Sequence, residues 1–185
     1  MLLTGFPPIV APQTRLLILG SMPGVESLRQ QQYYAHPRNA FWLIMGELVG
    51  AYPELDYDQR IRILKQNRIS LWDVLDRCVR PGSLDGDIER ESEMTNQLVE
   101  FCRDQPELRA LAFNGRKARE TFQRHFCKKS PAFWQKFLLI DLPSTSPAYA
   151  TLRPPVKLEM WRQRLCPLFC PTISINAHLY PLQLD

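Results

Sequence analysis

Short apolar runs alternate with longer amphipathic segments along this chain. Each run is brief and is followed by a turn-forming or polar segment, which is typical of buried strands in a parallel sheet. The first run, Leu16-Leu17-Ile18-Leu19, is stopped by Gly20. The predicted strands are 16–19, 69–72, 108–113 and 137–142.

Helical periodicity fills the segments between these runs. The strongly apolar segment 40–49 predicts a helix packed on the sheet, whereas 57–66 and 88–102 carry charges at helical spacing. Two further helices are expected at 117–126 and 156–165. The alternation of strands and helices predicts a three-layer α/β/α fold with a central, mostly parallel four-stranded sheet.

Composition is that of an ordinary globular protein. The 185 residues contain 45% hydrophobic and 23% charged residues, and they fit one domain over 1–185, with an irregular lead-in at 1–14 and an irregular tail at 166–185. No apolar run approaches the roughly 20 residues of a membrane span, and the N-terminus does not resemble a secretory signal. The net charge of +4 permits a nucleic-acid partner but does not require one.

The five cysteines do not indicate a disulfide framework, because their number is odd and most spacings are wide. A reducing cytoplasm is the expected location. Cys166 and Cys170 form a single CxxxC pair without a second pair of ligands nearby, so we expect no metal, iron-sulfur cluster or other cofactor.

Three unusual segments are expected at the crevice where open parallel sheets form their sites. They are GSMPG (20–24), YYAHPRNAFW (33–42) and LPSTSPAYA (142–150). The first and the third directly follow predicted strands, and the second lies in a loop ahead of the predicted helix at 40–49. Each has a simpler structural interpretation. The first could be a plain strand-to-helix turn, Asn39 in the second could be the N-cap of the next helix, and the third could be a rigid polar loop.

Taken together, the order of these segments resembles the uracil-DNA glycosylase superfamily. The chain is most similar to its hypoxanthine (deoxyinosine) DNA glycosylase branch, and the mismatch-specific uracil glycosylases are similar through their GxxPG and AHPxNxFW segments. Further resemblance lies in SLWDVL (70–75), GSLD (82–85) and FNGRKA (113–118), so that the matches cover about 16–150.

The resemblance implies that Asn39 is the catalytic residue. The superfamily normally carries Asp or Asn before the proline of the first turn, but Met22 stands there and is no base. In the hypoxanthine branch the asparagine of the HPxNxFW segment takes over, and this residue falls on Asn39. Its amide oxygen can orient a water, which suffices where the sugar develops cationic character.

The resemblance also assigns residues to the flipped base. Tyr34 matches an aromatic residue that stacks on the base. Asp73 lies near the position of an asparagine that reads the Watson–Crick edge of the base, although Trp72 competes for this position. A helix cap or a surface charge would also explain Asp73. A carboxylate at Asp73 would accept from N1–H of hypoxanthine.

Relatives place a histidine where Leu142 stands, so the leaving base must be stabilised by His36 or by backbone N–H groups. The backbone groups in question belong to Ser21 and Met22.

The last loop matches the segment that grips DNA. Its hydroxyls would bind phosphate, and Ala148 or Tyr149 would fill the space left by the flipped base. Lys117 could contact the DNA backbone, whereas Asn114 is expected to cap the following helix. The predicted phosphate-binding hydroxyls belong to Ser144, Thr145 and Ser146.

The sequence thus predicts a monofunctional DNA glycosylase, with DNA containing a deaminated base as its partner. Hypoxanthine is the leading base, and uracil and xanthine are the alternatives. No lysine lies in the three main segments, so a lyase step is not expected. A non-catalytic module that binds DNA lesions or nucleotides remains open. A small-molecule hydrolase lacks support, because the chain has no GxSxG motif.

Overall fold

Four short apolar segments form the central sheet of the computed structural model, which describes residues 2–82 and 84–169. The strand order is β3-β2-β6-β7, and all three pairings are parallel. The predicted four-stranded parallel sheet is therefore confirmed. The strands are β2 (Leu16–Gly20), β3 (Ile69–Asp73), β6 (Ala110–Asn114) and β7 (Leu138–Leu142).

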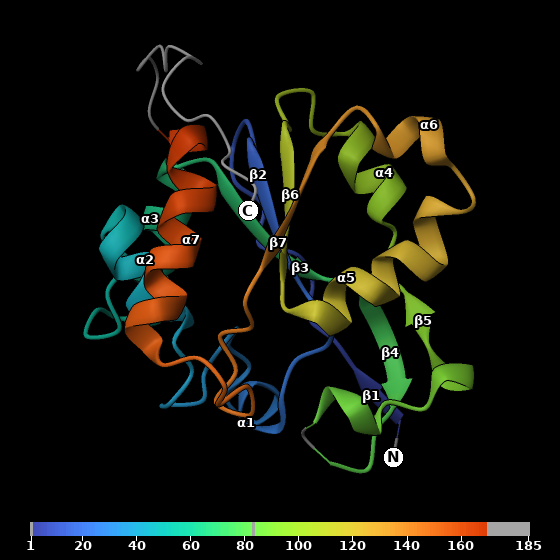
Figure 1. Ribbon diagram of the computed structural model, residues 1–185, viewed down its shortest axis with the longest axis horizontal. Coiled ribbons are helices and arrows are strands. Elements are labelled where there is room, and N and C mark those ends of the chain that lie inside the picture. Colours follow the sequence, from blue (N-terminus) through green and yellow to red (C-terminus); the bar gives the residue numbers. More distant parts are fainter. Residues whose placement is uncertain (1, 83, 170–185) are drawn as a thin grey trace, which may run out of the picture.

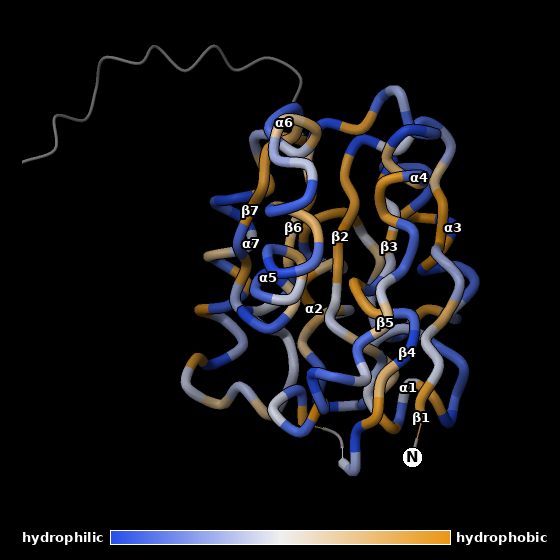
Figure 2. Tube along the Cα trace, turned by 90° about the vertical axis from the view of Figure 1, so that its right-hand side faces the viewer, coloured by the Kyte–Doolittle hydropathy of each residue, from blue (hydrophilic) through white to orange (hydrophobic). Residues whose placement is uncertain are grey.

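Helices cover both faces of this sheet, as Figure 1 shows. In β2, Leu16 and Ile18 face one core cluster and Leu17 and Leu19 face the other, because successive side chains of a strand point to opposite sides. Figure 2 shows these strands as a largely hydrophobic centre. The first layer contains α2 (Phe41–Val49), α3 (Tyr57–Gln66) and α7 (Pro154–Phe169); the second contains α4 (Leu98–Arg103), α5 (Arg116–Phe122), the π-helix η3 (Gln123–Cys127) and α6 (Pro131–Trp134).

A second, smaller sheet was not predicted. It has the order β1-β4-β5 and antiparallel pairing, and it lies beside the second helical layer in Figure 1. Its β1 lies inside the predicted irregular lead-in. A strand of two or three residues has no periodicity of its own and depends on its partner, which is distant in the chain. The strands are β1 (Leu2–Thr4), β4 (Leu75–Val79) and β5 (Met94–Thr95).

The helix predicted over 88–102 is wrong for most of its length. Only α4 is α-helical there, and the residues before it form a short 3-10 turn, η2 (Arg90–Ser92), and then β5. Thr95 pairs with Leu75 of β4, and Glu93 is turned into a buried ion cluster. Tertiary pairing therefore overrides the helical spacing of the charges.

The structure also contains short elements that were not predicted and one helix that ends later than predicted. Two short helices, α1 (Val25–Gln30) and α6, were not expected, and η1 (Asp85–Asp87) is a further 3-10 turn. Helix α7 runs through Pro167 to Phe169, so the first residues of the predicted irregular tail, 166–169, are helical; residues 170–185, including Cys170, lie outside the described part. Among the described residues, no helix combines the length and hydropathy needed to cross a bilayer.

The parallel pairing brings the carboxyl ends of the four central strands to one edge of the sheet. Its register sets Gly20 beside Asp73 and Asn114 beside Leu142. The segments that follow these strands therefore meet at one place, as the rule for open parallel sheets requires.

A substitution at Gly115 tests how closely the segment after β6 approaches the loop after β7. Its φ is +100°, and an added Cβ would lie 2.8 Å from the Ser144 Cβ. We expect Gly115→Ala to lower the free energy of unfolding by about 2 kcal/mol in denaturant titrations, because it combines backbone strain with a steric clash. Gly86→Ala is the control, since a Cβ there meets no atom within 4 Å. Equal effects of the two substitutions would contradict this packing.

Candidate active site

A cleft of about 750 Å³ opens at the carboxyl edge of the central sheet. Its walls come from the segment after β2, the loop before α2, the η1 turn and the loop after β7. The cleft brings together eleven of the predicted site residues: Ser21, Met22, Tyr34, His36, Asn39, Asp73, Ser144, Thr145, Ser146, Ala148 and Tyr149.

Asn39 both supports the start of α2 and lines the cleft. Its Oδ1 accepts a hydrogen bond from the backbone N–H of Phe41 at 3.0 Å. An amide oxygen has two lone pairs, so one remains for a water molecule. The N-cap of α2 is Ala40 and not Asn39, so the capping interpretation is wrong as stated, although the bond from Phe41 still leaves Asn39 able to hold a water.

His36 has one ring nitrogen engaged by its own loop. Nδ1 accepts from the backbone N–H of Arg38 at 3.1 Å. In the neutral ring the proton must then sit on Nε2, which leaves an N–H donor for another partner. His36 also lines the cleft, where such a donor can serve a ligand.

Tyr34 is held in a strained backbone conformation with φ of +57°. One face of its ring stacks on the fully buried Phe41, with 3.8 Å between ring centroids and 18° between ring planes. Its hydroxyl is buried without a hydrogen-bond partner of standard geometry among residues 2–82 and 84–169. Burial and the charge of Asp73 raise its pKa, and the nearby Asn114 side chain opposes this rise. Strain and unsatisfied polar groups of this kind gather at functional sites.

Asp73 ends β3 as a buried residue with only 3% exposure, which excludes the interpretation as a surface charge. Its Oδ1 lies so close to Gly20 that a Cβ there would collide with it, and its Oδ2 has no partner in the described part of the chain. The competing Trp72 is directed elsewhere, since it packs in the opposite layer and donates to the Phe6 carbonyl.

The charge state of Asp73 differs from the expected carboxylate. Burial raises its pKa to about 8, with a further contribution from the like charge of Asp85, and Arg80 opposes this rise. The neutral acid is therefore the main form at neutral pH. A neutral carboxyl group offers one O–H donor as well as an acceptor oxygen.

Met22 and Ser21 meet the cleft in different ways. The Met22 side chain packs with Leu3, Leu75 and Cys78 under the small sheet, so only its backbone is available to a ligand. Within residues 2–82 and 84–169, neither Ser21 nor Met22 donates its N–H to a backbone carbonyl. Both groups are therefore free to serve as donors.

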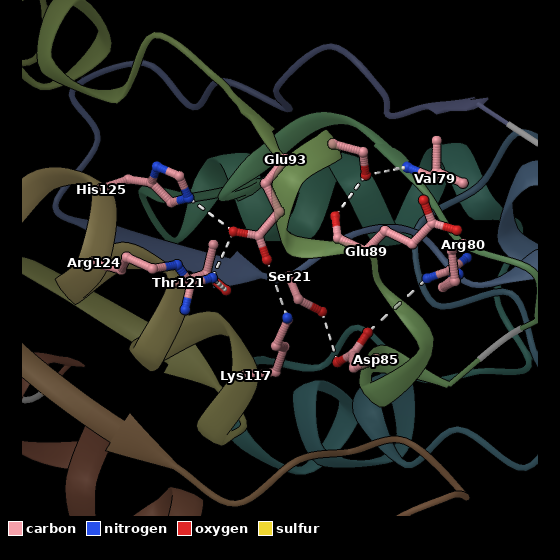
Figure 3. Close-up of polar contacts among 11 residues, drawn as sticks. Ser21, Val79, Arg80, Asp85, Glu89, Glu93, Lys117, Thr121, Arg124 and His125 are labelled. Carbon is pink, nitrogen blue, oxygen red and sulfur yellow. Dashed lines mark hydrogen bonds and ion pairs between the residues drawn. The ribbon is translucent and has the colours of Figure 1, made fainter.

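Asp85 and Arg80 were missed by the sequence analysis. Asp85 lines the cleft and accepts from Ser21 Oγ at 2.7 Å, as Figure 3 shows. Arg80 is buried and donates to the carbonyls of Pro23 and Gly82 at 2.6 and 2.8 Å. The GSLD segment contains Asp85, but nothing in the sequence indicated that it would meet the first turn.

Asn114 does not cap the following helix, which corrects the expected role. Its side chain donates to Thr145 Oγ1 and accepts from the Thr145 N–H, both at 2.9 Å. This pair fixes the last loop to the end of β6. Thr145 is almost fully buried, and its hydroxyl is already engaged.

The rest of the last loop is held from within and from α7. Ser144 Oγ accepts from the Ser146 N–H, and Ser146 Oγ accepts from the Ala148 N–H, both at 3.2 Å. The buried Lys157 donates to the carbonyls of Ser146 and Tyr149 at 3.2 and 2.8 Å. The loop is thus rigid, and Ala148 and Tyr149 stand exposed at its tip.

Lys117 is not brought to the cleft. Its Nζ lies 3.1 Å from the carboxylate of Glu93, which also contacts Arg124 and His125 at 2.5 and 2.8 Å (Figure 3). Burial opposes the ionisation of Glu93, but hydrogen bonds from His125, Arg124 and Lys117 outweigh it and lower its pKa. By contrast Arg116, one residue earlier, lines the cleft with an exposed side chain.

Comparisons with known proteins identify the family of the chain. Residues 7–165 match the family model of the uracil DNA glycosylase superfamily. A protein of Methanosarcina acetivorans named hypoxanthine DNA glycosylase is 43% identical over 122 residues, which cover 65% of this chain and 75% of the relative. A protein of Methanosarcina barkeri with the same name is 41% identical over 117 residues, which cover 63% and 73%.

Solved structures are also similar to this chain. One of them is the solution NMR structure of a candidate uracil DNA glycosylase from Methanosarcina acetivorans. The TM-score is 0.70 at 34% sequence identity, and the match covers 88% of this chain and 98% of that one.

The unsatisfied hydroxyl of Tyr34 gives a stability prediction. We expect Tyr34→Phe to leave the free energy of unfolding unchanged or to raise it by up to ~1 kcal/mol, because the buried hydroxyl makes no hydrogen bond of standard geometry. Tyr33→Phe is the matched control, since the Tyr33 hydroxyl donates to the Pro7 carbonyl at 3.3 Å and its loss should destabilise the fold. Denaturant unfolding of both variants tests this, and a clear loss of stability for Tyr34→Phe would contradict the assignment.

Proposed function

Because the chain belongs to the uracil DNA glycosylase superfamily, we propose that it is a monofunctional DNA glycosylase that hydrolyses the N-glycosidic bond of a flipped deaminated base. The observation that carries this proposal is the meeting of Asn39, Tyr34 and Asp73 in one cleft. Its volume of about 750 Å³ is that of an ordinary small-ligand pocket.

Hypoxanthine is the proposed base, with uracil and xanthine as alternatives. Two similar proteins are named hypoxanthine DNA glycosylases. The substrate is DNA, and the activity belongs to base-excision repair. We place it in the cytoplasm because the cysteine pattern favours a reducing compartment.

The proposed chemistry is hydrolysis at the sugar carbon C1′. The bond from C1′ to the base nitrogen breaks, its electron pair leaves with the base, and water adds to C1′. Asn39 Oδ1 holds this water with the lone pair that Phe41 does not use. The water supplies the hydroxyl group of the abasic sugar and the proton that finally resides on the departed base.

Neutral donors stabilise the base as it departs. His36 offers Nε2–H, and the first turn offers the free N–H groups of Ser21 and Met22. Such donors are most effective when they are fixed before the reaction. The open face of the Tyr34 ring, opposite Phe41, forms the stacking surface for the base.

The rigid last loop grips the DNA. Ser144 and Ser146 each accept a backbone N–H and keep a hydroxyl proton to donate to phosphate. Ala148 and Tyr149, exposed at the tip, fill the place of the flipped base. Arg38 and Arg116 add exposed positive charge at the cleft. Lys117 is omitted from this set because it pairs with Glu93.

A non-catalytic lesion-binding module is the second candidate. It is favoured by Met22, which stands at the sequence position where the superfamily usually has its catalytic residue. The Met22 side chain packs in the core. The decisive experiment incubates the protein with oligonucleotides that each carry one deaminated base, followed by alkaline cleavage of abasic sites. Cleavage at hypoxanthine supports the glycosylase, whereas binding without base release supports the module.

Asn39→Ala tests the catalytic assignment. We expect a loss of about 10²-fold or more in the single-turnover excision rate, because the water loses its orienting group, while binding to the lesion remains largely intact. Asn39→Asp is the companion variant, since it keeps the oxygen that accepts from Phe41. Normal excision by Asn39→Ala would remove Asn39 from the mechanism.

Borohydride trapping tests the monofunctional character. A lyase forms a Schiff base between a lysine and the sugar, but no lysine lines the cleft in the described part of the chain, and Lys157 is bound to two carbonyls. We therefore expect no covalent enzyme–DNA adduct when borohydride is added during excision. Detection of an adduct by gel electrophoresis would show a lyase step.

A further inference from the structure

The cleft contains a carboxyl group that the fold leaves without a partner. Asp73 is 3% exposed, its Oδ2 has no hydrogen-bond partner within residues 2–82 and 84–169, and its Oδ1 lies against Gly20. The Tyr34 hydroxyl, also unpartnered, approaches the same position at Gly20. Buried polar groups are nearly always hydrogen-bonded, so an unpartnered group on a cleft wall points to a ligand.

The charged groups around Asp73 do not neutralise it by contact. Arg80 gives hydrogen bonds to the carbonyls of Pro23 and Gly82 and lies 4.0 Å from Asp85. Asp85 is the other charged group that shifts the pKa of Asp73, and Asp73 in turn raises the pKa values of the Tyr33 and Tyr34 phenols that face it. Burial and the like charge of Asp85 raise the pKa of Asp73 to about 8. The group therefore enters the reaction as a neutral acid at neutral pH.

We propose that Asp73 recognises the lactam edge of the flipped base as a neutral acid, accepting from its ring N–H and donating its own O–H to the adjacent carbonyl oxygen. This inference rests on the proposed glycosylase function. Hypoxanthine, uracil and xanthine all contain an N–H next to a C=O, so the edge defines the substrate class. Two parallel hydrogen bonds pair this edge with a carboxylic acid.

The same contact assists departure of the base. When the bond to C1′ breaks, its electron pair enters the base and negative charge develops on the carbonyl oxygen. The O–H donor of Asp73 stabilises this charge without losing its proton. An ionised Asp73 would instead lack the donor and repel the developing anion.

The charge state gives the sign of the pH dependence. Below a pH of about 8 the acid is neutral and the donor is present; above it the carboxylate forms and the donor is lost. The excision rate should therefore decline at alkaline pH and approach a tenfold fall for each pH unit.

The test measures single-turnover excision of hypoxanthine from DNA between neutral pH and about pH 9.5, using wild type, Asp73→Asn and Asp73→Leu. The amide of Asn has the same acceptor and donor but does not titrate. We expect Asp73→Asn to be slower than wild type at neutral pH by up to about tenfold, and Asp73→Leu to be slower by about 10²-fold or more. The ratio of wild type to Asp73→Asn should fall steadily as the pH rises.

This ratio isolates the enzyme, because any titration of the base itself affects both proteins equally. A constant ratio across the pH range, or an Asp73→Leu variant as active as Asp73→Asn, would overturn the proposal. Thermal unfolding at each pH controls for folding, and Asp73→Asn should melt no lower than wild type because its amide takes up no proton on folding. If wild type releases no base at any pH, the proposed function itself fails; if it releases base with a constant ratio, only this inference fails.

Discussion

The contact between the Asp73 carboxyl group and the backbone at Gly20 is the constraint on which the site depends. Parallel pairing of β2 and β3 places the two residues side by side, and only a residue without a Cβ leaves room for the carboxyl oxygen. Because the group is buried there, its neutral form is favoured. One steric requirement thus explains the glycine, the position of the acid and its charge state.

The surrounding loops are held in place by polar side chains that bond to other parts of the protein. Arg80 ties the first turn to the segment around Gly82, Asn114 ties the last loop to β6, and Lys157 holds the tip of that loop. Each of these side chains hydrogen-bonds to backbone carbonyls or to a hydroxyl group and so restricts the movement of the loop that carries them. The donors of the cleft are therefore preorganised, which is how a site without a strong base can support hydrolysis.

The sequence predicted the central sheet from local signals, whereas most residues of the cleft were predicted from the resemblance to the glycosylase superfamily. Apolar runs such as 16–19 identify buried strands, and the rule for parallel sheets then places the segments after them together. The small sheet and the role of Asp85 were not predictable, because β1 and β5 are too short to show a period and Asp85 meets Ser21 only through the tertiary fold. The charge state of Asp73 could not be predicted from the sequence either, since it depends on how deeply the side chain is buried.

The proposed mechanism therefore depends on whether the Asp73 side chain carries a proton. Its protonation can be observed directly in the free protein by NMR, through the pH dependence of the Asp73 side-chain carbonyl carbon, with Asp73→Asn to assign the signal. We predict a titration midpoint at a pH of about 8. A midpoint near the ordinary aspartate value of about 4 would contradict it, because the group would then be a carboxylate under all working conditions.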